Sequence, residues 1–301
     1  MIDKENLIVC GDYGGTNFTV AIYSLSGVSV LKKDFIAKQF SVYGIDECVN
    51  VISSSIKSIP LKKKSLSALS IGISGLRYNK DKELMTKKLK VKTGIKNIIC
   101  DSDAITALEG AFLSGDGAIL ISGTGSVIYG KYKKKVFRAG GWGRYIGDEG
   151  SGYWIGVQAL NKLGIFFDYN IKNRYTKFFE NEFGITPDNM LDKIYKNNFK
   201  ISSIAEKIIL SKERDAYLFS DILESAADNL ALLISDYINI SKCSLPLKVA
   251  LSGSTINKEN RLTKLLNEAV KKYFGKKVLL INPENSPQYG AFLLAKKKFK
   301  I

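Results

Sequence analysis

One order of segments, which occurs twice, constrains the fold of this chain more than any other feature. A short apolar run at 7–10 ends at the turn 11–17, and β-rich segments follow. A second apolar run at 118–121 ends at the turn 122–126 and is again followed by β-rich segments. The residues differ, but the order is the same. The pattern therefore predicts a duplicated α/β architecture.

Both turns have the composition of a loop that binds phosphate. The first reads GDYGGTN and the second SGTGS. Glycine allows backbone N–H groups to converge on an anion, and a neighbouring Thr or Ser hydroxyl adds another donor. Two such turns, each at the end of an apolar run, predict one nucleotide held between two domains.

A third glycine-rich segment, GGWGRYIGDEGSGYW at 140–154, is the most unusual part of the chain. Its backbone has to turn tightly or lie close to another group, and a helical pattern follows at once. Trp142 is locked between glycines. We expect it to line a pocket, with packing in a core as the alternative. For Trp154, on the following helix, we expect core packing.

The chain has 301 residues, which is enough for two domains that each bury a core. The boundary is expected near 112–117, where Ser114–Gly117 is a candidate hinge. We therefore expect an N-terminal domain at 1–114 and a C-terminal domain at 115–286. A closing helix at 287–301 is expected to join the first domain.

The chain contains no histidine, whereas Asp and Glu together number 29. This excludes Ser-His-Asp and Cys-His catalysis, the HExxH zinc site and any histidine general base. A carboxylate becomes the default base. Two candidates follow the apolar run at 98–100, namely Asp101 and Asp103, and the second stands in the first turn of a predicted helix.

The 45 Lys and Arg residues give a net charge of +16, which invites a nucleic-acid hypothesis. The lysines, however, form short clusters scattered along the chain, as at Lys62–Lys64, Lys133–Lys135 and Lys296–Lys298. Arginine is scarce, and no RNA-binding or zinc-finger spacing is present. We therefore expect a lysine-rich surface and no nucleic-acid partner.

No apolar run approaches the roughly 18 residues of a membrane span, and the N-terminus has no signal-peptide character. The four cysteines stand far apart without a CxxC pair, so we expect reduced thiols, most of them buried. These features predict a cytoplasmic protein with no membrane partner.

The motifs together carry a family resemblance. The DxGGT turn, the SGTGS turn, the Gly253–Ser254 element and the GGWG…GDEGSGYW run resemble the superfold of actin and the sugar kinases. Within it, the chain is similar to the N-acetylglucosamine kinase branch of the BadF/BadG/BcrA/BcrD ATPase family. The likeness spans nearly the whole chain, and the last motif is highly specific. It implies α/β, ribonuclease H-like domains, duplicated, with a cleft between them.

The resemblance implies that the chain binds MgATP. Asp12, beside the first turn, would hold Mg²⁺, with a turn-forming role as the alternative. Phosphoryl transfer depends mostly on positioning and charge neutralisation, so a metal and two backbone cradles supply much of what it needs. The residues expected to bind ATP are Gly14, Gly15, Thr16, Asn17, Gly123, Thr124, Gly125, Gly253 and Ser254.

The resemblance also implies a catalytic residue and a sugar site. Asp103 matches the family's catalytic base, and we prefer it to Asp101 because Ala104, Ala107 and Ala111 continue the helix from it. The residues expected to contact the sugar are Ser74, Gly75, Asp103, Thr124, Gly141, Trp142 and Asp148.

The reaction implied by the resemblance is that of an ATP-dependent N-acetylhexosamine kinase. It would phosphorylate the 6-hydroxyl of N-acetylglucosamine, with N-acetylmuramate as a further substrate, in amino-sugar salvage or cell-wall recycling. A glucosamine kinase is one alternative. A less favoured one is an activator ATPase with an iron–sulfur cluster, which would need cysteine thiolates at a dimer interface. A homodimer is a family-level expectation.

Overall fold

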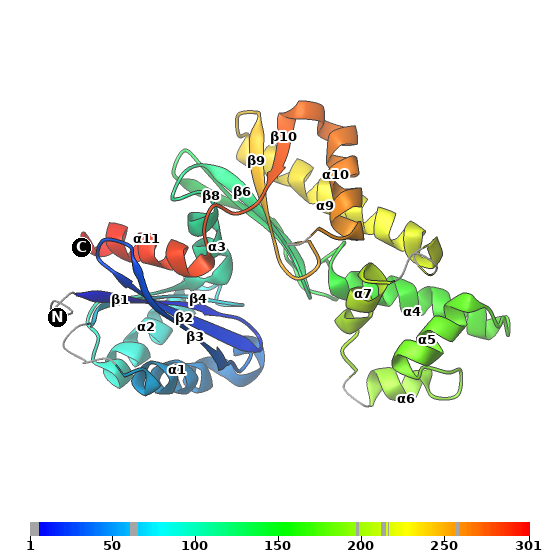
Figure 1. The fold of residues 1–301 in the computed structure, drawn as a ribbon, viewed down its shortest axis with the longest axis horizontal. Helices are drawn as coiled ribbons and strands as arrows, with labels where there is room; N and C mark the ends of the chain where they lie inside the picture. Colours follow the sequence, from blue (N-terminus) through cyan, green and yellow to red (C-terminus); the bar gives the residue numbers. More distant parts are fainter. Residues whose placement is uncertain (1–5, 61–65, 197–198, 212–214, 216, 257–258) are drawn as a thin grey trace. The chain divides into compact units, whose positions relative to one another are not determined.

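The computed structural model describes residues 6–60, 66–196, 199–211, 215, 217–256 and 259–301 (Figure 1). The chain divides into two compact units. Unit 1 comprises Met1–Gly117 and Pro283–Ile301, and unit 2 comprises Ala118–Asn282. The predicted lysine cluster Lys62–Lys64 lies outside the described residues.

Unit 1 is built on a five-stranded sheet in the order β3-β2-β1-β4-β5. β1 pairs antiparallel with β2 and β2 with β3, whereas β1, β4 and β5 run parallel. The strands are β1 (Leu7–Tyr13), β2 (Asn17–Ser24), β3 (Ser29–Ile36), β4 (Leu66–Ile73) and β5 (Ile98–Ser102).

Helices cover both faces of this sheet, which explains why the first apolar run is continuous rather than alternating. Val9 packs in a core with α1 and α2, and the neighbouring Ile8 and Cys10 pack in a second core with α11. Figure 1 shows α1 and α2 on one side of the sheet and α3 and α11 on the other. The helices are α1 (Phe40–Ser58), α2 (Asn79–Thr93), α3 (Asp103–Ala111) and α11 (Pro287–Phe299).

Unit 2 repeats the same strand order. Its sheet reads β10-β9-β6-β7-β8, which is the order of unit 1 counted from the opposite edge. The predicted duplication is therefore confirmed. The strands are β6 (Gly117–Ser122), β7 (Ser126–Tyr132), β8 (Lys135–Gly140), β9 (Leu247–Ser252) and β10 (Val278–Ile281).

The helices of unit 2 enclose one large apolar core. Aromatic rings fill part of it, with Tyr175 centred 4.9 Å from Phe219. Trp154 packs against this core, as predicted. The helices are α4 (Gly152–Asp168), α5 (Arg174–Phe183), α6 (Met190–Tyr195), α7 (Ser202–Ile209), α9 (Ser220–Ser241) and α10 (Arg261–Phe274).

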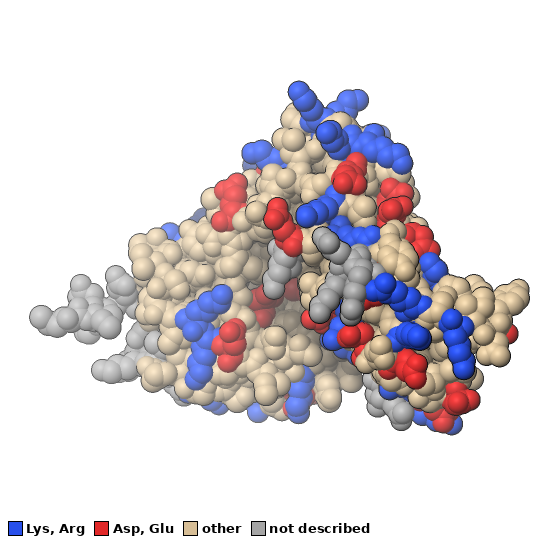
Figure 2. Space-filling model, turned by 45° about the vertical axis from the view of Figure 1, so that its right-hand side comes forward, with Lys and Arg blue, Asp and Glu red and all other residues tan. Residues whose placement is uncertain are grey.

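The surface charges, the helices and the thiols can be compared with the sequence expectations of no nucleic-acid partner, no membrane span and reduced cysteines. Figure 2 shows basic and acidic side chains interspersed over the visible face. Across the described ranges, none of the helices combines the length and the apolar character that a bilayer crossing requires. The four cysteines are free; Cys10, Cys48 and Cys100 are buried and Cys243 is half-buried.

Candidate active site residues in the two units

The candidate acids of unit 1 lie at the carboxyl ends of its parallel strands. Because β1, β4 and β5 run parallel, their carboxyl ends meet at one edge of the sheet, where α/β proteins commonly bind ligands. The strand register aligns Asp12 of β1 with Gly72 of β4, and Gly72 with Asp101 of β5. Asp103 follows β5 directly as the first residue of α3, and Ser102 is the N-cap residue.

Asp12 is held in an environment that disfavours its charge. Burial is the main cause that raises its pKa to about 7, and the Asp103 carboxylate adds to the rise. The Lys32 ammonium acts in the opposite direction. A carboxylate whose charge is disfavoured by burial and by a neighbouring acid is stabilised as an anion when a cation binds beside it.

The donor set around Asp12 fits Mg²⁺ bound together with phosphate. No group of three or more Asp, Glu or Cys residues able to hold a metal exists in the part of the chain that the structure describes. Mg²⁺ commonly takes one or two carboxylates and completes its shell with phosphate oxygens and water. Asp12 would supply such a carboxylate.

Asp103 has the surroundings of a general base. Burial raises its pKa, while hydrogen bonds from the Ser74 hydroxyl and the Ala104 N–H, together with the charge of Arg77, act to lower it. The Ala104 N–H lies 2.9 Å from Asp103 Oδ1. The net rise in pKa strengthens the carboxylate as a base.

Asp101, the rival candidate, is already occupied. Its carboxylate forms an ion pair with Lys82 of α2 and accepts a hydrogen bond from the Ser102 N–H at 2.7 Å. Of these two rival acids, Asp103 is the one that acts on the charge of Asp12. The preference for Asp103 as the base stays a prediction.

The first glycine turn leaves donors and space at the end of β1. The Gly14 N–H donates to the Asn17 carbonyl at 2.8 Å, so Gly14 closes the turn instead of offering its N–H to a ligand. The N–H groups of Gly15 and Thr16 donate to no backbone carbonyl among the described residues. A Cβ added at Gly15 would meet only Gln39 Cγ, at 4.0 Å. This open space is large enough for an anion to approach the turn.

Ser74 and Gly75, which were predicted to contact the sugar, follow β4 directly, and Ser74 acts on Asp103. The Ser74 N–H donates to the Tyr13 carbonyl at 2.8 Å, which places Ser74 between the ends of β1 and β4. Its hydroxyl acts to lower the pKa of Asp103. Gly75 follows with a left-handed φ of +85° and is exposed.

The glycine turn of unit 2 repeats the arrangement. The Gly123 N–H closes the turn on the Gly125 carbonyl at 2.9 Å. The carbonyls of Gly123 and Thr124 accept from the first N–H groups of α4, at 2.7 and 3.3 Å. The N–H groups of Thr124 and Gly125 donate to no backbone carbonyl in the described ranges. Each turn therefore presents two backbone donors in sequence.

Asp148 lies directly against this turn. The side chain is buried at 9% exposure, and the Gly143 N–H donates to Asp148 Oδ1 at 3.2 Å. A Cβ added at Gly125 would lie 2.6 Å from Asp148 Oδ2, so only glycine admits this carboxylate. Asp148 also has a left-handed φ of +63°, a strained value for a residue with a side chain.

Trp142 is an exposed aromatic residue in a segment of glycines. Its side chain is 68% exposed, so core packing, the alternative for this residue, is wrong. The Arg138 guanidinium lies 4.7 Å from the centre of the ring and donates through Nη2 to the Gly141 carbonyl at 2.7 Å. Trp142 is thus braced by a neighbouring strand and open to a ligand.

Gly253 and Ser254 meet the same turn from β9. Gly253 has a φ of +95°, and an added Cβ would clash with the backbone of Ser122. Thr255 was not predicted from the sequence. Its hydroxyl lies 2.6 Å from Ser122 Oγ and so connects the segment after β9 to the end of β6. Its place directly after Gly253–Ser254 is the only signal that the sequence offers for it.

Three further residues near the site were also missed. Lys32 acts on Asp12, Arg77 acts on Asp103, and Arg138 braces Trp142. None belongs to a recognisable motif. Each reaches its partner through strand register or a loop position, which a linear pattern does not reveal.

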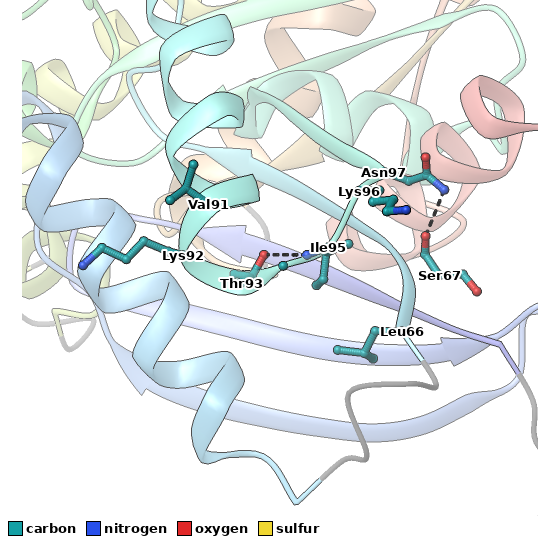
Figure 3. A pocket seen from close by; sticks show the side chains of 9 residues that line it. Leu66, Ser67, Val91, Lys92, Thr93, Ile95, Lys96 and Asn97 are labelled. Carbon is teal, nitrogen blue, oxygen red and sulfur yellow. Dashed lines mark hydrogen bonds between the residues drawn. The ribbon is translucent and has the colours of Figure 1, made fainter.

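A hollow elsewhere in unit 1 is unrelated to these residues. It has a volume of about 540 Å³ and lies at the amino ends of β4 and β5, at the opposite ends of the strands from Asp12 and Asp103. Figure 3 shows Lys92, Thr93 and Lys96 among its lining side chains. No acid or glycine turn of the candidate site contributes to it.

The fold is shared with solved sugar-kinase structures. A Chromobacterium violaceum protein proposed to be an N-acetylglucosamine kinase superposes with a TM-score of 0.78 at 22% identity, covering 97% of this chain and 99% of that one. A ROK family glucokinase from Streptomyces griseus, solved with glucose and AMPPNP, gives 0.60 at 14% identity, covering 97% and 99%. These likenesses confirm the predicted fold class.

The sequence comparisons define the family. The N-acetylmuramic acid/N-acetylglucosamine kinase of Clostridium acetobutylicum is 30% identical over 247 residues, which are 77% of this chain and 78% of that protein. The model of the BadF/BadG/BcrA/BcrD ATPase family matches residues 12–295, from the first candidate acid to the closing helix. The resemblance inferred from the motifs is thereby confirmed, and the chain belongs to the BadF/BadG/BcrA/BcrD ATPase family.

Proposed function

We propose that this protein is an ATP-dependent sugar kinase that phosphorylates the 6-hydroxyl of N-acetylglucosamine, with N-acetylmuramate as a second substrate. One observation supports it above the others: Asp12 and Asp103 lie at one sheet edge, and the pKa of each is raised by burial. A cation site beside a strengthened base is what phosphoryl transfer to a hydroxyl requires. The Clostridium relative supplies the substrate class.

In this proposal Asp103 handles the proton. Its carboxylate accepts a hydrogen bond from the sugar hydroxyl and takes the proton as the hydroxyl oxygen bonds to the γ-phosphorus of ATP. The bond between the γ-phosphorus and the bridging oxygen breaks in the same step, and ADP leaves. The Ser74 hydroxyl and the Ala104 N–H hold the carboxylate in place. Asp12 would bind Mg²⁺, which neutralises charge on the phosphates when it is bound.

The two turns would position the nucleotide. The unengaged N–H groups of Gly15 and Thr16, and those of Thr124 and Gly125, are suited to phosphate oxygens. Asn17 would contact the same phosphates from the start of β2. Gly253 and Ser254 would lie against the adenosine, because they follow the carboxyl end of β9.

The sugar would be held by groups that suit a carbohydrate. Asp148 offers carboxylate oxygens to ring hydroxyls, and the exposed indole of Trp142 offers an apolar face to the ring or its acyl group. Ser74, Gly75, Thr124 and Gly141 complete the proposed set. We further propose that the protein is cytoplasmic, forms a homodimer and acts in amino-sugar salvage or cell-wall recycling.

The cysteines do not favour the activator-ATPase alternative. Cys48 and Cys100 are buried in the core beneath α1 and α2, and Cys10 is buried beneath α11. Thiols enclosed in apolar cores are unsuited to holding an iron–sulfur cluster at a subunit interface.

The proposal is tested by a coupled assay of ADP release with MgATP. The panel is N-acetylglucosamine, N-acetylmuramate, N-acetylmannosamine, glucosamine and glucose, compared by kcat/KM, and the product is analysed by NMR for phosphorylation at O6. We expect preference for an N-acetylated sugar. ATP turnover that is independent of every sugar would refute the proposal.

A further inference from the structure

Arg138 makes two contacts with the segment that carries Trp142. It lies on β8, opposite Tyr129 of β7, so its backbone is fixed by the sheet. Its Nη2 donates to the Gly141 carbonyl at 2.7 Å, and its guanidinium carbon lies 4.7 Å from the centre of the Trp142 ring. Among the described residues nothing accepts a hydrogen bond from its buried Nε. The planar group is thus committed to the indole and the adjoining peptide.

These contacts orient a ring that has little else to hold it. Glycines stand on both sides of Trp142, and Gly141 and Gly143 have left-handed φ values of +69° and +97°. The indole is nevertheless 68% exposed. A guanidinium stacked on the ring limits its rotation and leaves much of the indole open to a ligand. Arg138 therefore has the geometry of a residue that preorganises Trp142.

The guanidinium also adds a positive charge beside Trp142, whereas the buried Asp148 carboxylate, which accepts from the Gly143 N–H, is a negative charge of the same segment. A guanidinium remains charged at any physiological pH. A neutral acetamido group or a carboxylate is tolerated or attracted near it, whereas an ammonium group is repelled. Glucosamine carries an ammonium group at neutral pH in the position where N-acetylglucosamine carries an amide, and N-acetylmuramate adds a carboxylate.

We propose that Arg138 is a positioning and specificity-determining residue, which fixes Trp142 as a platform for the sugar and selects N-acylated amino sugars over those with a free amine. This inference rests on the proposed function. The inference extends the proposed function by naming the residue that makes the enzyme prefer N-acetylglucosamine and N-acetylmuramate to glucosamine. Trp142 contacts the substrate, and Arg138 acts through Trp142 and through its charge.

The first test compares Arg138→Gln with the wild type on N-acetylglucosamine, N-acetylmuramate and glucosamine. We expect the KM for N-acetylglucosamine to rise about tenfold, with kcat and the KM for ATP within about twofold. The ratio of kcat/KM for N-acetylglucosamine to kcat/KM for glucosamine should fall about fivefold, because the ammonium group of glucosamine is no longer repelled by the Arg138 guanidinium. N-acetylmuramate should lose at least as much affinity as N-acetylglucosamine.

Two variants separate the geometry from the charge. Arg138→Lys keeps the charge but loses the planar fork, so the preference against glucosamine should persist while the KM for N-acetylglucosamine rises. Lys135→Gln removes a charge from an exposed residue of the same strand and should leave all the constants unchanged. Loss of the preference in Arg138→Lys would contradict the role of the charge.

A spectroscopic test reads Trp142 directly. The chain contains two tryptophans, so Trp154→Phe leaves Trp142 as the sole indole. In that background N-acetylglucosamine should change the emission, and adding Arg138→Gln should raise the sugar concentration required about tenfold. A calorimetric scan establishes that each variant is folded.

Different results would refute the proposed function and the proposed role of Arg138. A wild-type protein that phosphorylates none of the sugars would refute the proposed function. An active wild type whose Arg138→Gln variant has an unchanged KM and unchanged sugar preference would refute the role of Arg138 alone. A uniform fall in kcat for every sugar, with a lowered Tm, would also refute it, because that result indicates a structural role.

Discussion

The two units have the same strand order and present different chemistry at the carboxyl ends of their strands. In unit 1 these ends carry Asp12 and Asp103, two carboxylates whose pKa values are raised by burial. In unit 2 they carry a turn bonded to the start of α4 and one carboxylate, Asp148, held by a backbone N–H. The two units therefore share one strand order and differ in the side chains at the carboxyl ends of their strands.

The glycine turns show the same divergence on a smaller scale. Gly14 and Gly123 each close their own turn, and two N–H groups follow in each. Space for a side chain exists at Gly15, whereas at Gly125 it is filled by Asp148. Glycines of the two turns therefore differ in their surroundings, with open space at Gly15 and a carboxylate against Gly125.

The largest effect is expected from the acids of unit 1. Asp103→Asn should lower kcat by about a thousandfold, because the amide cannot accept the proton, with little change in Tm. Asp101→Asn, whose partner is Lys82, should lower kcat by less than about tenfold. Steady-state kinetics on the sugar that the wild type prefers makes the comparison. Near-normal turnover in Asp103→Asn would exclude it as the base.

The next largest effect is expected from one glycine of each turn. Gly125→Ala should destabilise the protein by about 1–3 kcal/mol and lower kcat/KM by about a hundredfold, since its Cβ displaces the Asp148 carboxylate. Gly15→Ala should change stability by less than about 0.5 kcal/mol while raising the KM for ATP. Calorimetry and kinetics measure both. Equal destabilisation by the two substitutions would remove the distinction between the turns.

The pH dependence of stability should reveal the cost of burying the charge of Asp12. The pKa of Asp12 is about 7 in the folded protein and about 3.9 when unfolded, so the folded state retains the proton longer. Its contribution is complete below pH 4 and is lost as the pH rises through 7. Without Mg²⁺ or ATP, Asp12→Asn should therefore raise the Tm by about 2–4 °C at pH 8 and leave it unchanged at pH 4.

The exposed Asp34 provides the matched control for this prediction. Asp34→Asn should leave the slope of Tm against pH as in the wild type. If Asp12→Asn leaves the slope unaltered as well, the burial of Asp12 does not disfavour its charge.

The smallest effect concerns the hydroxyl that locks unit 2. Thr255→Val should cost about 1–2 kcal/mol, because Ser122 loses its buried partner. Thr255→Ser should retain most of the stability. Thr106 of unit 1 bonds within its own helix, to the Asp103 carbonyl, so Thr106→Val should cost less. Denaturant titrations of the three variants rank them, and a larger loss at Thr106 would contradict the assignment.

Local patterns predicted much of the fold. The apolar runs at 7–10 and 118–121 lie in β1 and β6. β1 continues through Tyr13 and β2 begins at Asn17, so the expected turn at 11–17 is shorter than predicted and only residues 14–16 connect the two strands. Asp103 was expected in the first turn of a helix and is the first residue of α3. Such features depend on neighbours in the chain, so hydrophobic periodicity and turn chemistry reveal them.

Contacts between elements that are distant in sequence could not be predicted from local patterns. The pairing of Asp101 with Lys82 requires α2 to pack beside β5, and the effect of Lys32 on Asp12 depends on the register of β3. The choice between Asp101 and Asp103 rested on helix continuity in the sequence, and the salt bridge that engages Asp101 is encoded by no motif.

The duplicated order of strands and turns, the absence of a histidine base and the positions of the candidate acids follow from the amino-acid order alone, because they depend on composition and on short spacings. Packing in three dimensions settles which acid is engaged, which glycines close their turns and how Arg138 braces Trp142. Those properties arise where strands and helices distant in sequence meet, since burial and charge are set by whatever packs alongside.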